Sequence, residues 1–366
     1  MSREVASART WLARINALPM RQPVAVMNVC GGHERSLTRL GLRDVLPPTI
    51  RLVAGPGCPV CVCPEADLAA AIAIAQSGAA TLVTFGDMLR VPINAPKGAV
   101  RSLAAAKAAG ADVRPIGTPQ EAVALARAAP ERQIVFFVAG FETTTAPVAA
   151  MLAEGVPDNL SLLLAARRTW PAVDMLLRQG TAGLDALIAP GHVATVMGAE
   201  EWRFIPERYH LPVAVAGFSA ASLLAGLYAV LLQIQEGRPG LDNCYAGLAR
   251  PEGNTRARAM LAETMQMEDA HWRGIGVIPA SGFGLRGAWR RFDARARFAA
   301  HLPAPTAKSE MPPGCDCAAV VLGQRAPDEC RLYGRACTPQ QPVGPCMVSD
   351  EGACHIWWQA GRRAAA

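Results

Sequence analysis

The chain contains 366 residues with a mass of 38.6 kDa, of which 51% are hydrophobic and 18% are charged. This composition is typical of a folded protein with room for two or three domains, and it excludes an intrinsically disordered chain. The net charge is +6, but the basic residues are scattered without forming a run, so no nucleic-acid-binding surface is expected.

The first predicted element is an amphipathic helix over residues 7–18, with Trp11 and Ile15 on its apolar face. We expect residues 1–19 to pack on the body of the protein as an N-terminal helix. Charges occur throughout this segment and the apolar stretch of a secretory signal is missing, which predicts a cytoplasmic protein.

An alternation of short β-branched strands, glycine-containing turns and Ala/Leu-rich helices runs from about residue 20 to residue 235. This pattern is typical of βαβ units and predicts an α/β fold with parallel sheets. The strands could form one large sheet or two small ones, and the Pro-rich segment 92–119 is interpreted as a crossing between two halves. The predicted strands cover residues 24–29, 51–54, 80–85, 134–139, 184–189 and 213–216.

The uncharged run 211–235 has the length of a membrane span. Pro212 and Gly217 interrupt it, so we interpret it as a buried strand followed by a helix, and we expect no membrane association.

Chemically active side chains follow several of the predicted strands. The loops CGGHE (30–34), GPGCPVC (55–61), GFETT (140–144) and PGH (190–192) all occupy such positions. Because functional loops gather at the carboxyl ends of parallel strands, these loops are expected to converge on one cleft. The candidate residues in them are Cys30, His33, Cys58, Cys61, Glu142 and His192.

Each loop also has a simpler interpretation. Cys30 and His33 could both face one metal ion, or they could be a buried thiol and a surface imidazole. The pair Cys58 and Cys61 before a predicted helix is typical of a redox dithiol, although half of a zinc site has the same spacing. The GFETT loop lacks the lysine of a phosphate-binding loop, so its threonines could simply cap a helix.

The pattern changes near residue 236, where a linker-like stretch precedes a predicted helix over residues 255–270 and a cysteine-rich C-terminus. Four of these cysteines have the spacing C-x14-C-x6-C-x16-C, namely Cys315, Cys330, Cys337 and Cys354. Four thiolates in a turn-rich segment favour an iron–sulfur cluster over a zinc site or unligated thiols. The spacing does not decide between Cys315 and Cys317 as the first ligand.

Taken together and in this order, the segments NVCGGHE, GPGCPVCVCP, GFETTTAP, PGHV, WRGIGVIPASG and CRLYGRACTPQQPVGPCMVSDEGAC resemble the HypD family of [NiFe]-hydrogenase maturation factors. The resemblance extends from about residue 10 to residue 358. It implies two small parallel-sheet βαβ domains facing a cleft, at residues 20–118 and 119–235, and a mostly α or irregular 4Fe-4S domain at residues 236–366.

The resemblance also implies a function. Members of the family act with a small chaperone of the HypC/HupF type as the scaffold on which an iron atom receives two cyanides and one carbon monoxide. A HypE-type partner donates the cyanide, and the chaperone passes the Fe(CN)2CO unit to the hydrogenase large subunit. The cofactors implied are a 4Fe-4S cluster and the mononuclear iron carrying CN and CO.

By position in the family motifs, Cys30 becomes the iron ligand with His33 beside it, and Cys58 and Cys61 become the redox dithiol. Glu142 of GFETT and Glu351 of the S-x-E-G-x-C stretch become further active-site residues. The cluster ligands implied are Cys315, Cys330, Cys337 and Cys354.

The chain departs from the family pattern at Cys63, where threonine is expected, so the pair that oxidises is left open. An iron–sulfur thiol–disulfide oxidoreductase acting on proteins is an alternative function, and a zinc-stabilised binding protein is another. The Cys30–His33 loop argues against the reductase, which has no use for a separate metal-binding loop.

Overall fold

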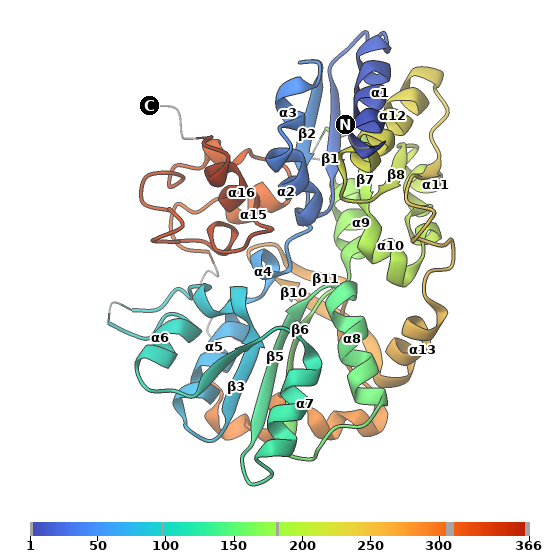
Figure 1. Cartoon of the computed structure of the whole chain (residues 1–366). Helices are drawn as coiled ribbons and strands as arrows, with labels where there is room; N and C mark the ends of the chain where they lie inside the picture. The colour runs from blue at the N-terminus through green and yellow to red at the C-terminus, as the bar shows by residue number, and fades with distance from the viewer. Residues whose placement is uncertain (1–2, 97, 181–182, 305–310, 363–366) are drawn as a thin grey trace.

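Two parallel sheets form the body of the protein in the computed structural model, which describes residues 3–96, 98–180, 183–304 and 311–362 (Figure 1). The first sheet has the strand order β2-β1-β7-β8-β9 and the second has the order β4-β3-β5-β6. All neighbouring strands in both sheets are parallel, which confirms the predicted fold class.

The first sheet is buried on both faces, as parallel sheets must be. Side chains alternate along β1, where Val24 and Val26 face one layer of helices and Ala25 and Met27 face the other. Its strands are β1 (Val24–Asn28), β2 (Ile50–Ala54), β7 (Ala186–Pro190), β8 (Val213–Ala216) and β9 (Leu241–Asn243). Helices α1 (Arg3–Ala17), α2 (Gly31–Arg39), α3 (Leu42–Val45) and α12 (Ala220–Glu236) cover one face, and α9 (Thr169–Gln179), α10 (Gly191–Met197) and α11 (Phe204–Tyr209) lie toward the other.

The N-terminal helix packs as expected. It lies along α12, where the rings of Trp11 and Tyr228 are 5.4 Å apart, and Ile15 is fully buried. The segment 211–235 is the predicted strand and helix, β8 and α12. No helix in the described part of the chain is both long enough and apolar enough to cross a bilayer.

The second sheet is built around β5, all seven residues of which are buried. Phe137 faces α5, while Phe136 and Val138 face α7 and α8. The strands are β3 (Thr81–Phe85), β4 (Val113–Ile116), β5 (Ile134–Gly140) and β6 (Leu160–Ala166). The helices are α5 (Glu65–Gln76), α6 (Leu103–Ala108), α7 (Pro119–Ala128) and α8 (Glu142–Ala153).

The chain forms the first sheet in two separate passages and the second sheet in a single passage between them, which differs from the contiguous domains expected. It passes from β2 through α4 (Pro59–Val62) and α5 into the second sheet, and returns from β6 through α9 to the first. The expected boundary between residues 118 and 119 therefore lies between β4 and β5 of a single sheet. Residues 92–119, expected to be a crossing, contain α6 and β4.

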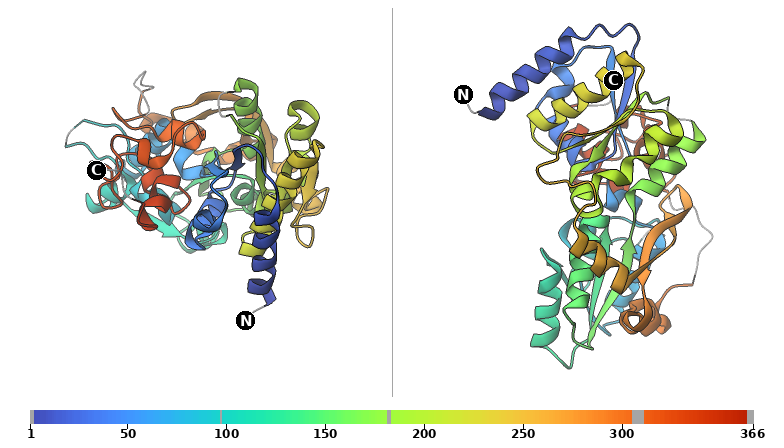
Figure 2. Two further views of the ribbon diagram at one scale, coloured as in Figure 1. Left: turned by 90° about the horizontal axis from the view of Figure 1, so that it is seen from above. Right: turned by 90° about the vertical axis from the view of Figure 1, so that its right-hand side faces the viewer.

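After residue 254 the chain adds a helix, a β-hairpin and a cysteine-rich C-terminal region to the two sheets. Helix α13 (Thr255–Thr264) is shorter than expected, because residues from Met265 onward pair instead in the antiparallel hairpin of β10 (Met265–Trp272) and β11 (Gly276–Leu285). The hairpin lies beside β6, and a short helix, α14 (Ala294–Arg297), follows it. Among the described residues 311–362, here called the C-terminal region, the α-helices are α15 (Cys317–Val321) and α16 (Ala353–Gln359), joined by short turns. The region packs on α2 and α4 between the two sheets (Figures 1 and 2).

Candidate metal and redox site

The carboxyl ends of both sheets meet at a small cavity of about 130 Å³. Loops that follow β1, β2, β5, β6, β7 and β8 all contribute to its wall, so the predicted convergence of strand-end loops is found. Its lining includes Cys30, Gly57, Pro59, Thr143, Thr144, Thr169, His192, Phe218 and, from the C-terminal region, Glu351.

Cys30 lies at the start of α2, as the residue that precedes its first turn. The backbone N–H groups of Gly32 and His33 face its thiol and favour the thiolate, but burial and the nearby Glu351 carboxylate oppose it more strongly. These effects together raise the pKa of Cys30 to about 12. The thiol is therefore protonated at neutral pH until a cation compensates for its charge.

The two glycines after Cys30 are required by close packing. A Cβ atom on Gly31 would lie 2.5 Å from the backbone oxygen of Glu351, and one on Gly32 would lie 2.8 Å from the Phe218 ring. The Gly31 N–H donates to the Gly57 carbonyl at 3.1 Å, which ties the CGGHE turn to the GPGC loop.

His33 is fully buried and does not line the cavity. Its Nε2 lies 3.0 Å from the Ala216 carbonyl oxygen, and burial lowers its pKa to about 4. Phe218 separates its ring from that of His192, with ring-centre distances of 4.7 Å and 4.0 Å. His33 is thus a neutral imidazole behind Phe218, while His192 is the histidine that reaches the cavity.

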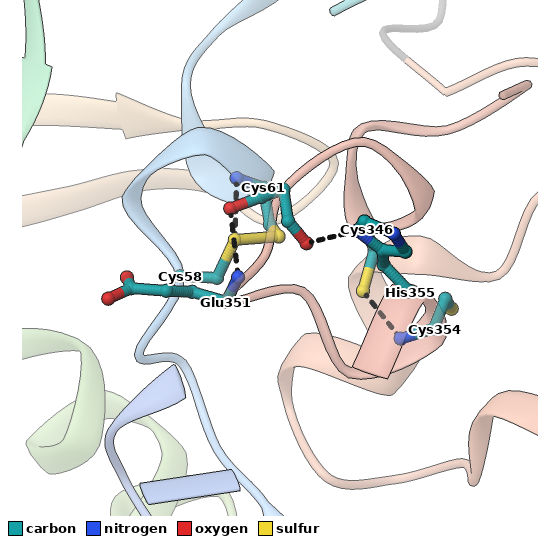
Figure 3. Close-up of a disulfide and its surroundings, with 7 residues drawn as sticks. Cys58, Cys61, Cys346, Glu351, Cys354 and His355 are labelled. Atoms are coloured by element: carbon teal, nitrogen blue, oxygen red, sulfur yellow. Dashed lines mark hydrogen bonds between the residues drawn. A yellow bond between two sulfur atoms is a disulfide. The ribbon is translucent and has the colours of Figure 1, made fainter. Parts of the chain in front are cut away.

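Cys58 and Cys61 are joined by a disulfide bond at the start of α4. The Cys61 N–H donates to the Cys58 sulfur at 3.2 Å, and both residues are almost completely buried. Figure 3 shows the disulfide between Glu351 on one side and Cys346 on the other. Cys63 is also buried, and its pKa is raised by burial and by Asp67.

Glu351 is the acidic group nearest to Cys30. Burial and the charge of Asp87 raise its pKa to about 7, while Arg35 opposes the shift. The carboxyl group therefore changes charge near neutral pH, next to the thiol whose ionisation it influences.

Glu142, the other predicted acidic residue, does not reach the cavity. Its Oε1 accepts from the Thr169 N–H at 2.7 Å and its Oε2 interacts with the Thr169 hydroxyl at 2.6 Å. Thr169 lines the cavity in its place. Thr169 is not among the residues predicted from the sequence, because the strand before it, β6, is not among the predicted strands, although its apolar run 160–166 is a signal for a strand.

Six cysteines come together in the C-terminal region. The side chains of Cys315 and Cys317, of Cys317 and Cys346, and of Cys346 and Cys354 are close enough to shift each other's pKa, and the Cys354 N–H donates to the Cys346 sulfur at 3.3 Å. Cys330 and Cys337 lie close enough to raise the pKa of Cys354 through their charge. Burial also raises the pKa of Cys337, which favours its neutral thiol in the absence of a metal.

The donor set fits an iron–sulfur cluster. Four or more thiols of one soft ligand type converge in a mostly buried segment, as thiolate-ligated clusters require. Gly344 makes room for them, because a Cβ atom there would lie 2.6 Å from the Cys315 sulfur. With the side chains in these positions, however, no three His, Cys, Asp or Glu residues of the described ranges form a metal-binding arrangement. Binding of a cluster would therefore require the thiols to reorient and lose their protons.

A larger groove of about 970 Å³ lies beside the small cavity. The two share His192, Phe218 and Glu351, and the groove continues past Gly32 between α1, α2 and α12. Several aliphatic residues of those helices line it, together with Arg9, Arg35 and Arg39.

Comparison with known proteins adds an independent observation. The family model named HypD, described as "Hydrogenase formation hypA family", matches residues 6–361. The hydrogenase maturation factor HypD of Azotobacter vinelandii is 40% identical over 99% of this chain and 96% of its own length. The factor of the same name from Rhodobacter capsulatus is 40% identical over 100% and 98%, and a putative hydrogenase expression/formation protein of Methanocaldococcus jannaschii is 38% identical over 95% and 96%.

Proposed function

The chain belongs to the HypD family of hydrogenase formation proteins, and from that premise we propose that it is the scaffold on which the Fe(CN)2CO unit of a [NiFe]-hydrogenase is assembled. The observation that carries the proposal is the juxtaposition of three sulfur groups. The Cys30 thiol lies in the cavity, and Gly57 and Pro59, on either side of Cys58, line the same cavity. The C-terminal Cys346 and Cys354 lie beyond the disulfide, as Figure 3 shows.

In this proposal the iron is cargo, and Cys30 is its protein ligand. Thiolate sulfur is a soft donor that suits low-valent iron with cyanide and carbonyl ligands. The neutral His33 behind Phe218 acts indirectly, by fixing the ring that forms one wall of the cavity. Glu351 and His192 are the groups available to exchange protons or hydrogen bonds with bound ligands.

The reducing equivalents come from the other two sulfur groups. A 4Fe-4S cluster held by Cys315, Cys330, Cys337 and Cys354 would supply single electrons. Reduction of the Cys58–Cys61 disulfide breaks the S–S bond with two electrons and, after uptake of two protons, yields two thiols. The pair can therefore store two electrons next to Cys30, which suits the reductive release of cyanide from a thiocyanate carrier.

A small HypC-type chaperone would dock in the groove of about 970 Å³. A protein seated there would lie against Gly32 and Glu351, and could place a second sulfur ligand on an iron bound to Cys30. The HypE-type cyanide donor and the hydrogenase large subunit would meet the scaffold at the same opening.

Burial of the disulfide argues against the alternative of a protein thiol–disulfide oxidoreductase. The exposed fractions of Cys58 and Cys61 are only 4% and 2%, so a protein substrate could not reach either sulfur without opening the loop.

The proposal is tested by infrared spectroscopy of the protein purified anaerobically with its chaperone. Cyanide and carbonyl stretching bands are expected in the wild type. Cys30→Ser should lose both kinds of band and keep the cluster, because an alcohol oxygen is a poor ligand for low-spin iron. Cys244→Ser, at a half-buried thiol outside the cavity lining, is the matched control and should keep the bands. Bands of full intensity in Cys30→Ser would remove Cys30 as the iron ligand.

A further inference from the structure

The GFETT loop places two threonine hydroxyl groups, those of Thr143 and Thr144, at the start of α8. Phe141, the residue before the first turn of the helix, has no polar group in its side chain to cap it. The Thr145 hydroxyl is used inside the helix, because it donates to the Phe141 carbonyl oxygen at 2.9 Å. The hydroxyls of Thr143 and Thr144 form no hydrogen bond with any other residue in the described part of the chain. Helix capping, the simpler interpretation of this loop, therefore does not account for them.

Both threonines line the cavity of about 130 Å³ that Cys30 also lines. Cys30 follows β1 of the first sheet, whereas Thr143 and Thr144 follow β5 of the second sheet, so they approach the cavity from different sheets. Because the cavity is small, a diatomic ligand on an iron atom bound to Cys30 would reach the start of α8. The two hydroxyls are therefore placed to contact the ligands of that iron.

Packing around the start of α8 fixes the position of these hydroxyls. Thr144 lies directly against Gly140, where an added Cβ atom would be 2.3 Å from the Thr144 Cβ. The fully buried Glu142 accepts a hydrogen bond from the Thr169 N–H at 2.7 Å, which ties the start of α8 to the start of α9. Donors that are fixed before a ligand arrives lose little conformational freedom on binding, so they bind it more effectively.

The cavity has to stabilise negative charge without a permanent cation. None of the described residues that line it is Lys or Arg, and burial lowers the pKa of His192, so that imidazole is neutral at neutral pH. Two cyanides neutralise the charge of ferrous iron, and the Cys30 thiolate then leaves the bound unit with a net negative charge. Neutral hydrogen-bond donors must therefore supply the stabilisation, and the positive end of α8, a helix of 12 residues, adds to it.

Much of the remaining cavity wall is apolar. Val29, Pro190, Val193 and Phe218 all contribute to it. The nitrogen of an iron-bound cyanide carries negative charge and accepts strong hydrogen bonds, whereas the oxygen of iron-bound carbon monoxide accepts them poorly. A cavity with hydroxyl donors at α8 and apolar side chains elsewhere therefore distinguishes the two kinds of diatomic ligand.

We propose that Thr143 and Thr144 are specificity-determining residues, which recognise the cyanide ligands by donating their hydroxyl hydrogens to cyanide nitrogen. This inference rests on the proposed function, to which it adds the residues that determine where each diatomic ligand lies on the iron. The carbonyl ligand then faces the apolar side chains. No covalent bond forms or breaks in this recognition, and no electron or proton is transferred.

The inference is tested by the positions of the infrared bands of the protein purified anaerobically with its chaperone. Thr143→Val and Thr144→Val keep the shape of the side chain and remove the hydroxyl. In both variants the cyanide bands should move to lower wavenumber, because the hydrogen bond that withdraws charge from the nitrogen is lost. The carbonyl band should move in the same direction, because the iron becomes more electron-rich. Thr143→Ser and Thr144→Ser retain a hydroxyl and should keep the wild-type positions.

Thr145→Val is the matched control, since the Thr145 hydroxyl is bonded within the helix and the residue is outside the cavity lining. It should leave all band positions unchanged. A second measurement is the rate at which a chelator removes the cyanide-bearing iron. Thr144→Val should release it about 10-fold faster, the lower range for loss of a hydrogen bond to a charged group, while Thr144→Ser and Thr145→Val should match the wild type.

Unchanged band positions in both valine variants, or serine variants that shift as much as the valine variants, would overturn the assignment of the hydroxyls. A shift of the same size in Thr145→Val would overturn it too, because the cause would then be altered packing of α8. Failure of the proposed function looks different. In that case the wild type itself lacks the cyanide and carbonyl bands, and the inference fails with it.

Discussion

At the scale of single residues, burial and one neighbouring acid control the protonation of Cys30. Burial contributes most to its raised pKa, and the charge of Glu351 adds to it. Glu351 itself has a pKa of about 7, so its influence on Cys30 is present above that pH and disappears below it as the carboxyl group becomes neutral. A cation arriving at the cavity would meet a thiol and an acid that both release protons on binding.

Replacing Glu351 with Gln should therefore lower the pKa of Cys30 and make the thiol react several-fold faster with iodoacetamide at pH 8. Below about pH 6 the variant and the wild type should react at the same rate, because the wild-type Glu351 is then as uncharged as the glutamine that replaces it. Peptide mapping after timed alkylation measures Cys30 alone. Glu200→Gln, at a surface ion pair, should behave as wild type, and a pH-independent effect of Glu351→Gln would indicate altered packing instead of charge.

At the scale of elements, the site depends on tight turns at strand ends. Gly57 is the most constrained, since an added Cβ would lie 1.8 Å from the Val29 carbonyl oxygen and 2.5 Å from the Cys30 Cα. The GPGC turn can approach the CGGHE turn only because this side chain is missing, and the approach brings the disulfide to Cys30.

Gly57→Ala should consequently lower the free energy of unfolding by about 3 kcal/mol, the upper range for overpacking, because the obstruction is backbone and cannot rotate away. Urea unfolding followed by circular dichroism measures the change. Gly86→Ala is the matched control, since a Cβ there meets nothing within 4 Å and its backbone is not left-handed. Equal stability of both variants would show that the two turns can separate freely.

The sequence allowed most strands and the strand-end loops to be predicted, because burial on both faces produces short β-branched runs bounded by glycine. Two elements and one long-range contact show the limits of such patterns. The run 160–166 is apolar and Leu-rich, which does not distinguish a strand from a helix. The helix predicted over residues 255–270 includes residues 265–270, which instead belong to β10 and pair with β11. The contact of Gly31 with Glu351 joins residues 320 positions apart, and no local pattern reveals it.

At the scale of the whole molecule, a hydrogen bond connects α2 of the first sheet to the C-terminal region that carries the thiols. Glu34 of α2 accepts hydrogen bonds from Asn28, from Arg43 and, at 2.8 Å, from the Trp357 ring of α16. The helix that begins at Cys30 is thus bonded directly to the helix that carries Cys354. Strand order across the two sheets was beyond prediction from the sequence, because β7 inserts beside β1 only after the chain has completed the second sheet.

The thiol arrangement leads to a final prediction about the C-terminal region. Replacing Cys337 or Cys354 with Ala should abolish the charge-transfer absorption of a 4Fe-4S cluster in anaerobically purified protein. Each substitution should also destabilise the C-terminal region. The region contains few regular secondary-structure elements, so we expect its folding to be coupled to metal binding. Visible absorption and iron content measure the cluster, and limited proteolysis measures the stability of residues 311–362.

Cys317→Ala and Cys346→Ala are the matched controls, since both thiols are buried among the same six cysteines but lie outside the predicted ligand set. They should keep the cluster. Cys317 and Cys346 are close enough to shift each other's pKa, so replacing either one removes a contact within the group without removing a predicted ligand. A full cluster in both Cys337→Ala and Cys354→Ala would refute the ligand set. Loss in Cys317→Ala with retention in Cys315→Ala would move the first ligand from Cys315 to Cys317, the alternative that the spacing left open.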